Sequence, residues 1–314
     1  MKKNVFYLTA LAAVSATMMT SCINDENENS VTNSGEVINL TASMATETTR
    51  AKQDATENQD EQFESGQSIF VEAYKTGTTT SYTNSTGNYT TGSSGAMEGS
   101  ILYPYTDGVV SNVDVRAYYP TTNNSNNVTS SLTSFTVSTD QTDKAKYQAN
   151  DLMYASATNL AKGSTHNLTF YHALTKIIVN LVADGTIDDA SLTKVTAVKI
   201  NSTKPTITIA NGVTTDNTAS GTAADIDITG SDKANYAGII VPQTVAAGSD
   251  FITVTYNGQT LVYKIPTTPD TGKNFEKGTK YTYTLTLKAS SISLKSLKIE
   301  NWGTGEGDTK DMIL

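Results

Sequence analysis

From residue 37 onward, apolar and polar residues alternate along most of the chain. A period of two places successive side chains on opposite faces of an extended strand, so it predicts strands with one buried face. In the first such stretch, VINLTASM, one face carries Ile38, Leu40, Ala42 and Met44. Further strands are expected at 66–74 and 113–120 and at several stretches between 194 and 288.

The most apolar segment is HNLTFYHALTKIIVNLVADG, residues 166–185. Its residues from Leu174 to Val182 are almost continuously apolar, which is typical of a strand buried on both faces. A helix over 172–182 has the right length, but the β-branched residues favour a strand. Before this segment, residues 142–151 predict a short helix or turn, and Asn257-Gly258 predicts a hairpin.

The C-terminal tail, residues 291–314, keeps the alternation but changes its phase. Ile292 and Leu294 occupy even positions, whereas Leu297 and Ile299 occupy odd positions. Such a shift predicts either a β-bulge or a break into two short strands.

Many short strands with turn signals, and no helical repeats, predict an all-β protein of sandwich architecture. We place a domain boundary near Gly163, because the stretch NLAKGST separates two strand-rich halves. The expected β-sandwich domains are therefore 51–163 and 164–314.

The composition supports sheets with one face in water. Apolar residues make up 37% of the 314 residues, and Thr, Ser, Asn and Gly fill the remainder more than charged residues do. The net charge is −9 with a pI near 4.8. An acidic chain without a basic cluster argues against nucleic acid and against a polybasic membrane patch. The negative net charge favours solubility but does not indicate which substrate, if any, the protein binds.

Residues 1–21 are typical of a secretory signal, with Lys2 and Lys3 preceding a short apolar run. The single cysteine, Cys22, ends the stretch MTSC, which resembles a bacterial lipobox. In that type of signal the cysteine becomes the lipid-bearing N-terminus. The alternative is an ordinary signal cut after VSA, which leaves a free thiol. The acidic stretch at 23–29 is either a surface-sorting signal or a solvated tether.

No residue pattern indicates catalysis or a bound metal. His166 and His172 share a strand face, but two ligands are too few for zinc. Asp225 and Asp227 do not supply the oxygen ligands that calcium needs. The glycines after Trp302 lack the strand-turn-helix context of a phosphate-binding loop. We therefore expect no metal, no cofactor and no enzymatic activity.

Several segments, in order, resemble the fimbrillin family of Bacteroides-type bacteria, which includes subunits of type V pili. The resembling stretches are FESGQSIFVEAY (63–74), VDVRAYYP (113–120), QANDLMYA (148–155), LTFYHALTKIIVNL (168–181), the stretch 236–266, FEKGTKYTYTLTL (275–287) and LKIENW (297–302). The resemblance implies two β-sandwich domains of transthyretin-like build and a role in adhesion.

The resemblance also implies a route of assembly. The subunit is exported as a lipoprotein and held in the outer membrane by the lipid on Cys22. An arginine-specific surface protease then cuts the Arg50–Ala51 bond and releases 22–50 with its first strand. A strand from another copy or another pilus subunit fills the gap. The tail 291–314, with Ile292, Leu294, Leu297 and Ile299, is the donor by resemblance, or else an internal bulged strand.

Two other functions stay open at this stage. One is an uncleaved surface lipoprotein adhesin that binds a glycan or a host protein, in which Arg50 is a solvated linker charge. The other is an anchor or tip subunit of the pilus.

Overall fold

The computed structural model describes residues 36–45, 63–82, 84–106, 109–122, 132–210, 213–214, 219–230, 232–268, 270–302 and 310–312. The predicted signal, Cys22, Arg50 and Ala51 lie outside these residues. Within the described ranges, which begin at residue 36, no helix is long and apolar enough to cross a bilayer. The all-β prediction is confirmed, because strands account for nearly all regular structure.

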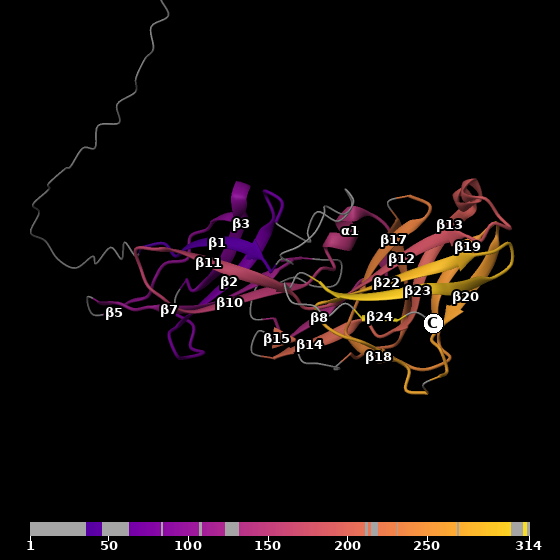
Figure 1. Cartoon of the computed structure of the whole chain (residues 1–314). Helices are drawn as coiled ribbons and strands as arrows, with labels where there is room; N and C mark the ends of the chain where they lie inside the picture. The colour runs from indigo at the N-terminus through magenta and orange to yellow at the C-terminus, as the bar shows by residue number, and fades with distance from the viewer. Residues whose placement is uncertain are drawn as a thin grey trace, which may run out of the picture. The chain divides into compact units, whose positions relative to one another are not determined.

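Seven strands close into a barrel in the order β1-β11-β10-β7-β2-β3-β4. Figure 1 shows them in indigo and magenta. They are β1 Asn39–Met44, β2 Ser68–Lys75, β3 Thr86–Thr91, β4 Ala96–Glu98, β7 Val113–Tyr119, β10 Met153–Leu160 and β11 Thr165–His172. Closure pairs every strand on both sides, so this part of the chain has no free sheet edge while β1 is in place.

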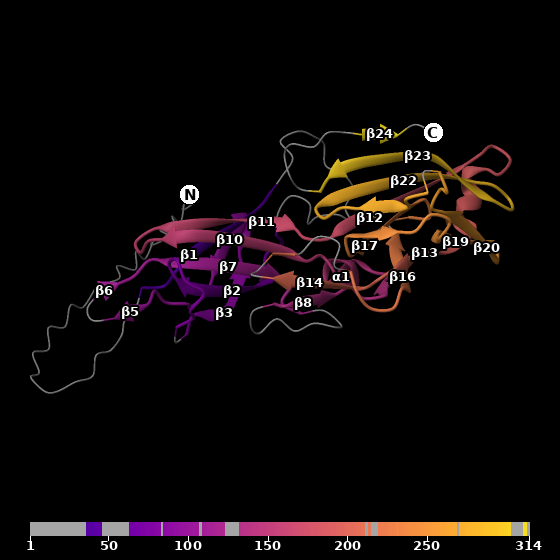
Figure 2. The same ribbon diagram turned by 90° about the horizontal axis from the view of Figure 1, so that it is seen from below.

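Ten strands form a larger sheet in the order β20-β19-β13-β16-β17-β12-β22-β23-β24, with β9 paired to β16. Figure 2 shows β12, β22, β23 and β24 side by side at one end of it. The strands are β9 Asp140–Gln141, β12 Thr175–Ala183, β13 Val195–Thr203, β16 Ala224–Gly230, β17 Asn235–Ile240, β19 Asp250–Tyr256, β20 Gln259–Lys264, β22 Thr279–Leu287, β23 Ile292–Asn301 and β24 Lys310–Met312.

Short elements complete the structure. Three small sheets pair β15-β14-β8, β18-β21 and β5-β6. Their strands are β5 Tyr105–Thr106, β6 Val109–Val110, β8 Ser134–Thr136, β14 Thr206–Ala210, β15 Val213–Thr214, β18 Gln243–Val245 and β21 Lys273–Phe275. The helices are η1 Ser93–Gly95, α1 Lys144–Gln148 and η2 Asp189–Lys194.

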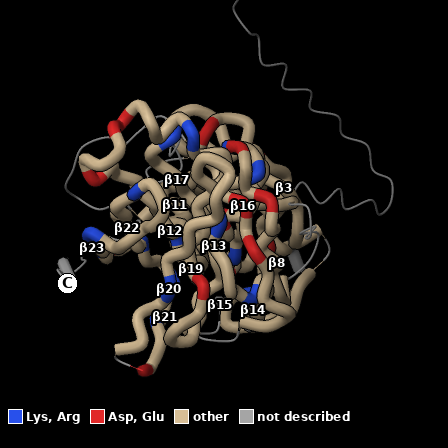
Figure 3. The backbone as a smooth tube through the Cα atoms, turned by 90° about the vertical axis from the view of Figure 1, so that its right-hand side faces the viewer, with Lys and Arg blue, Asp and Glu red and all other residues tan. Residues whose placement is uncertain are grey.

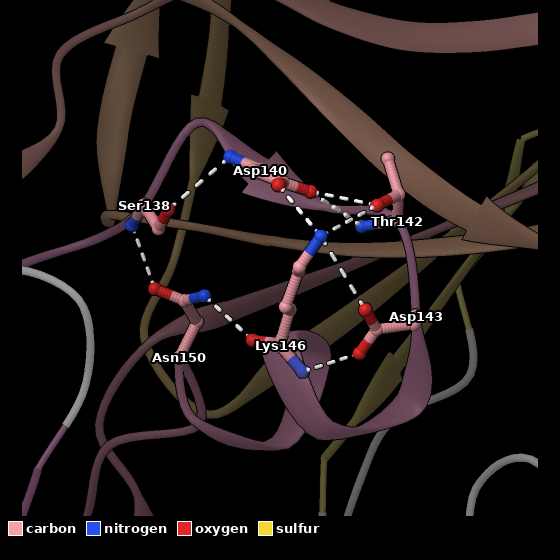
Figure 4. A network of polar contacts seen from close by, with 6 residues as sticks. All are labelled: Ser138, Asp140, Thr142, Asp143, Lys146 and Asn150. Atoms are coloured by element: carbon pink, nitrogen blue, oxygen red, sulfur yellow. Dashed lines mark hydrogen bonds and ion pairs between the residues drawn. The ribbon is translucent and has the colours of Figure 1, made fainter.

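The helix expected within 142–151 is α1. Polar side chains stabilise both of its ends (Figure 4). The Asp143 side chain accepts a hydrogen bond from the backbone N–H of Lys146, which is an N-cap. The Lys146 ammonium lies 2.7 Å from a carboxylate oxygen of Asp140. The Asn150 side chain then joins the end of α1 to the backbone N–H of Ser138.

The chain passes between the two sheet systems more than once, and Gly163 lies within the barrel. Gly163 has a φ of 83° and lies between β10 and β11, which pair antiparallel within the barrel. Conversely, β8 pairs with β14, and β9 pairs with β16. Residues 134–141 therefore belong with C-terminal strands although they precede Gly163. The glycine that suggested a linker makes a turn, and the division at 163 stays a prediction for independent domains.

The apolar segment 166–185 forms two strands rather than one. The chain leaves the ladder at Ala173 and Leu174, between β11 and β12. Within β12, residues 177–179 are all buried, because β17 and β22 flank the strand and side chains cover both faces. The predicted hairpin also forms, since Asn257 and Gly258 connect β19 to β20.

The predicted phase shift in the tail is a bulge. In the β22–β23 ladder, Thr284 faces Ser296 but Leu285 faces Leu294, so Lys295 is the extra residue. The bulge lets the apolar residues before and after it point toward the same core. Leu297 is buried there, and Ile292, Leu294 and Ile299 are partly buried against the same apolar cluster.

Charged residues of both signs are spread along the described backbone. On the face in Figure 3, lysines and acidic residues are interspersed around β13, β16 and β20. One such pair is Lys199 and Asp227, 3.1 Å apart on neighbouring strands. The described residues on this face therefore mix both signs of charge, which does not favour a polyanion.

Candidate functional site: the seam strand of the barrel

Strand β1 closes the barrel and is called here the seam strand. All six of its residues pair in parallel with β11, from Asn39 opposite Thr165 to Met44 opposite Phe170. On its other side it pairs antiparallel with β4 at Leu40 and Thr41. Removal of the seam strand would therefore leave a long unpaired edge on β11 and a short one on β4.

The alternating sequence fits this position between two strands. Ile38, Leu40, Ala42 and Met44 have exposed fractions of 0, 3, 8 and 5% and belong to the apolar core of the barrel. Around them lie Tyr89, Met97, Ile101, Leu168 and Phe170, which are in the same cluster. Burial of large apolar side chains contributes about 1.5–3 kcal/mol each, so Ile38, Leu40 and Met44 favour binding of this strand strongly and Ala42 contributes less.

Backbone contacts hold both ends of the seam strand. Before it, the Ile38 N–H donates to the Ile101 carbonyl at 2.8 Å, and the Tyr103 N–H donates to the Glu36 carbonyl at 2.9 Å. After it, the Ala45 N–H donates to the Phe170 carbonyl at 2.9 Å. These bonds use main-chain groups, so another strand of suitable length could form equivalents.

A tyrosine inside the barrel also binds the backbone of the seam strand. The Tyr89 hydroxyl donates to the Ile38 carbonyl at 2.9 Å. Burial raises the pKa of Tyr89 to about 12, because the phenolate would have to form away from water. The hydroxyl is therefore protonated at neutral pH and available as a donor. Loss of the seam strand would leave a buried hydroxyl without this acceptor.

Gly95 lets the short helix η1 approach the seam strand closely. Its φ is 78°, which favours glycine, and a Cβ there would overlap the carbonyl oxygen of Ala42. A side chain at 95 would therefore push β1 away from its neighbour. The sequence GSSG marks a turn but does not show that a strand lies against it.

Polar side chains connect β1 to β11 on the outer face of the barrel. The Thr41 hydroxyl donates to Asn167 Oδ1 at 3.2 Å, and Asn167 Nδ2 donates to the Ser43 hydroxyl at 2.9 Å. Asn167 Nδ2 also lies 3.4 Å from the Thr169 hydroxyl. We call Thr41, Ser43, Asn167 and Thr169 the outer clasp. Sequence reasoning missed Asn167, because only the β1–β11 register brings it opposite Thr41.

Three of the four candidate metal ligands, His166, His172 and Asp227, make other contacts. His166 Nε2 lies 2.8 Å from the Ala161 carbonyl, whereas His172 Nδ1 lies 2.8 Å from Asp151 Oδ1. Asp227 pairs with Lys199. Across the described ranges, no group of three His, Cys, Asp or Glu residues is arranged to hold a metal ion.

Comparison with known proteins identifies the family of this chain. The sequence model of a family described as fimbrillin-like matches residues 49–302. A curated relative from Bacteroides uniformis, named as a candidate fimbrium subunit, Fim1C, is 31% identical over 150 residues. That match covers 45% of this chain and 47% of the relative, so the chain spans about half the length of the curated relative it matches.

Solved structures show the same fold. A candidate cell adhesion protein from Bacteroides uniformis superposes with a TM-score of 0.62 at 24% identity and covers 86% of this chain and 99% of its own. A candidate cell adhesion protein from Bacteroides ovatus gives a TM-score of 0.61 at 20% identity, with 85% and 98% covered. The family match spans most of the sequence, including the barrel strands after β1, which precedes residue 49, and the large sheet up to Trp302. The chain belongs to the fimbrillin-like family.

Proposed function

We propose that this protein is a structural subunit of a cell-surface fimbria that serves adhesion. In this proposal it is exported as an outer-membrane lipoprotein on Cys22, cut between Arg50 and Ala51, and assembled by donor-strand exchange. The observation that carries the proposal is the position of the seam strand. It is the first strand of the barrel, it pairs on both sides, and the chain leaves it just before Arg50.

The position of the second arginine favours a single cut. The chain contains two arginines, Arg50 and Arg116. Arg116 lies within β7, where its backbone is paired with β2 and β10, and its guanidinium lies 5.0 Å from the ring centroid of Tyr74. A protease needs an extended segment free of a sheet, so the folded barrel protects Arg116.

The energetics set a requirement for the incoming strand. Cleavage after Arg50 leaves the seam strand held by noncovalent contacts, namely its ladder and its four inward side chains. A donor must restore both, because an unpaired edge and an open apolar core are unfavourable in water. A strand with alternating apolar residues from a second subunit meets this requirement by β-augmentation.

The tail, residues 291–314, is the proposed donor. Its last described strand, β24, is the terminal strand of the large sheet and pairs with β23. A strand at the edge of a sheet has one neighbouring strand, so its release breaks the hydrogen bonds to that one neighbour only. Its neighbour β23 carries Ile292, Leu294, Leu297 and Ile299, which are partly or fully buried in the subunit's own core. Release of β23 would expose these side chains, so the accepting barrel must bury them again for the exchange to be favourable.

A second candidate is an uncleaved surface adhesin, or an anchor or tip subunit, that binds a glycan or a host protein. The observation that favours it is Tyr171, whose exposed fraction is 42%. Its ring lies 6.1 Å from that of Tyr154 on the outer face of the barrel. Tyr154 is half-buried, so the exposed ring of Tyr171 is the part of this pair that a ligand can contact.

Limited digestion of the soluble precursor with an arginine-specific protease tests the proposal. We expect one early cut, a new N-terminus at Ala51, and oligomers that appear with the cut. Arg50→Ala should abolish all three, and Arg116→Ala should change none of them. A clipped protein that stays monomeric at high concentration would contradict donor-strand exchange and favour the adhesin.

A further inference from the structure

The contacts of the seam strand differ in how well they distinguish one strand from another. The hydrogen bonds of Ile38 and Ala45 involve the main chain, so any strand can make them. The inward positions accept alternating apolar residues, a pattern that recurs in many strands of this protein. Neither set identifies a particular partner. The outer clasp is the remaining set of contacts, and it depends on side-chain chemistry.

Asn167 contributes both a donor and an acceptor to this clasp. Its Oδ1 accepts from Thr41, and its Nδ2 donates to Ser43. Thr41 and Ser43 are two residues apart, so both point outward on the same face of β1. Each hydroxyl can donate or accept, which lets one amide satisfy both.

We propose that Asn167 selects the strand that occupies the seam. The partner is a β-strand of another subunit with hydroxyl side chains at two outward positions on either side of one inward apolar residue, as Thr41 and Ser43 flank Ala42. In the proposed donor tail, Ser291 and Ser293 flank Ile292 in this way. This inference rests on the proposed donor-strand exchange and adds a rule for which strand is accepted. The seam strand itself satisfies the rule with Thr41 and Ser43, which shows the geometry that a replacement must reproduce.

The same geometry disfavours charged or apolar residues at these two positions. Carboxylates at both positions leave Asn167 Oδ1 without a donor, and ammonium groups at both leave Asn167 Nδ2 without an acceptor, whichever way the amide is turned. An apolar residue leaves the amide without its strand partner. Specificity then arises partly from rejection of wrong strands, since all alternating strands share the attractive inward pattern.

A competition experiment tests the selection on the full chain. A site for a sequence-specific protease is placed within 46–62, so that cleavage does not depend on Arg50. The clipped protein is unfolded in urea, freed of the released segment, and refolded with an equimolar mixture of two peptides. One peptide is residues 36–45, and the other carries Thr41→Val and Ser43→Ala. Mass spectrometry of the refolded complex gives the ratio of bound peptides.

We expect the native peptide to be favoured by about 3–10-fold, because the two hydrogen bonds are at the surface and each contributes modestly. The preference should fall to about 1 when the chain carries Asn167→Ala. As a matched control, a peptide with Asn39→Ala, which changes an outward residue outside the clasp, should compete equally with the native peptide.

Each outcome has a separate meaning. Equal binding of the two peptides to the native chain would overturn the selection, and so would a preference that persists with Asn167→Ala. Both results leave donor-strand exchange intact. Binding of neither peptide would overturn the selection and donor-strand exchange together. Failure of a protease to cut at Arg50 bears on the proposed function alone.

Discussion

The imidazole of His172 is stacked on the indole of Trp302, with ring centroids 3.9 Å apart and planes 10° from parallel. His172 is the last residue of β11, the strand that pairs with the seam strand, and Trp302 directly follows β23 in the tail. Asp151 fixes the ring through a 2.8 Å contact between its Oδ1 and His172 Nδ1. This stack therefore connects the end of β11 in the barrel with the residue that follows β23 in the large sheet.

Trp302→Ala should destabilise the protein by about 3–5 kcal/mol, because the indole is 2% exposed and its removal leaves a cavity. Urea unfolding followed by circular dichroism measures this change. Trp302→Phe keeps a flat ring over His172 and should cost clearly less. An equal loss in both variants would show that ring stacking contributes little.

Leu40→Ala should lower the free energy of unfolding of the uncut chain by about 2–5 kcal/mol, since Leu40 is 3% exposed in the barrel core. Thr41→Ala, one residue later and on the outer face, should cost about 1 kcal/mol or less. Denaturant titration of both variants gives the comparison. Similar losses at the two positions would contradict the inward and outward assignment of β1.

Gly95→Ala should destabilise the protein more than Gly163→Ala does. Both glycines have positive φ values, 78° and 83°, so the backbone strain of the new side chain is similar. A Cβ at 95 meets the Ala42 carbonyl, whereas nothing lies within 4 Å of a Cβ at 163. The difference in unfolding free energy isolates the contact with the seam strand. In a clipped protein from which residues 22–50 have been removed, this difference should disappear.

Lys146→Met should reduce stability at pH 7 and have less effect near pH 2. The Lys146 ammonium is the main cause that lowers the pKa of Asp140 to about 2, with Thr142 adding two hydrogen bonds (Figure 4). A folded-state pKa below the unfolded value of about 3.9 stabilises the fold above that value. This contribution is lost as the pH falls from about 4 through 2.

Carboxyl NMR titration and urea unfolding at several pH values measure the Asp140 effect. Lys144→Met is the matched control, because its ammonium pairs with Glu64 at 2.7 Å rather than with Asp140. If Asp140 titrates unchanged in the Lys146 variant, Lys146 is not the cause of the lowered pKa.

Local patterns predicted much of this fold. Alternation over 38–44 gave a strand and its inward side chains, since the period of a strand fixes which residues share a face. The change of phase between Leu294 and Leu297 predicted a bulge or a break into two strands, and the structure has a bulge at Lys295. These features depend on a few neighbouring residues.

Features set by distant residues were not predictable in the same way. Gly163 makes a hairpin turn inside the barrel, and a linker glycine would look the same in sequence. β9 and β16 are more than 80 residues apart along the chain, yet they pair directly. Asn167 lies opposite Thr41 only because β1 and β11 adopt one particular register.

The sequence by itself determined an all-β chain, the inward face of its first strand, the change of phase in its tail and its resemblance to fimbrillins. Only the tertiary structure decided that the first strand closes a barrel, that Asn167 contacts its outer face, and that His172 stacks on Trp302. The physical reason is how far apart along the chain the interacting residues lie. Alternation is set by the backbone geometry of adjacent residues, whereas strand order and register depend on which distant surfaces bury the most apolar area together.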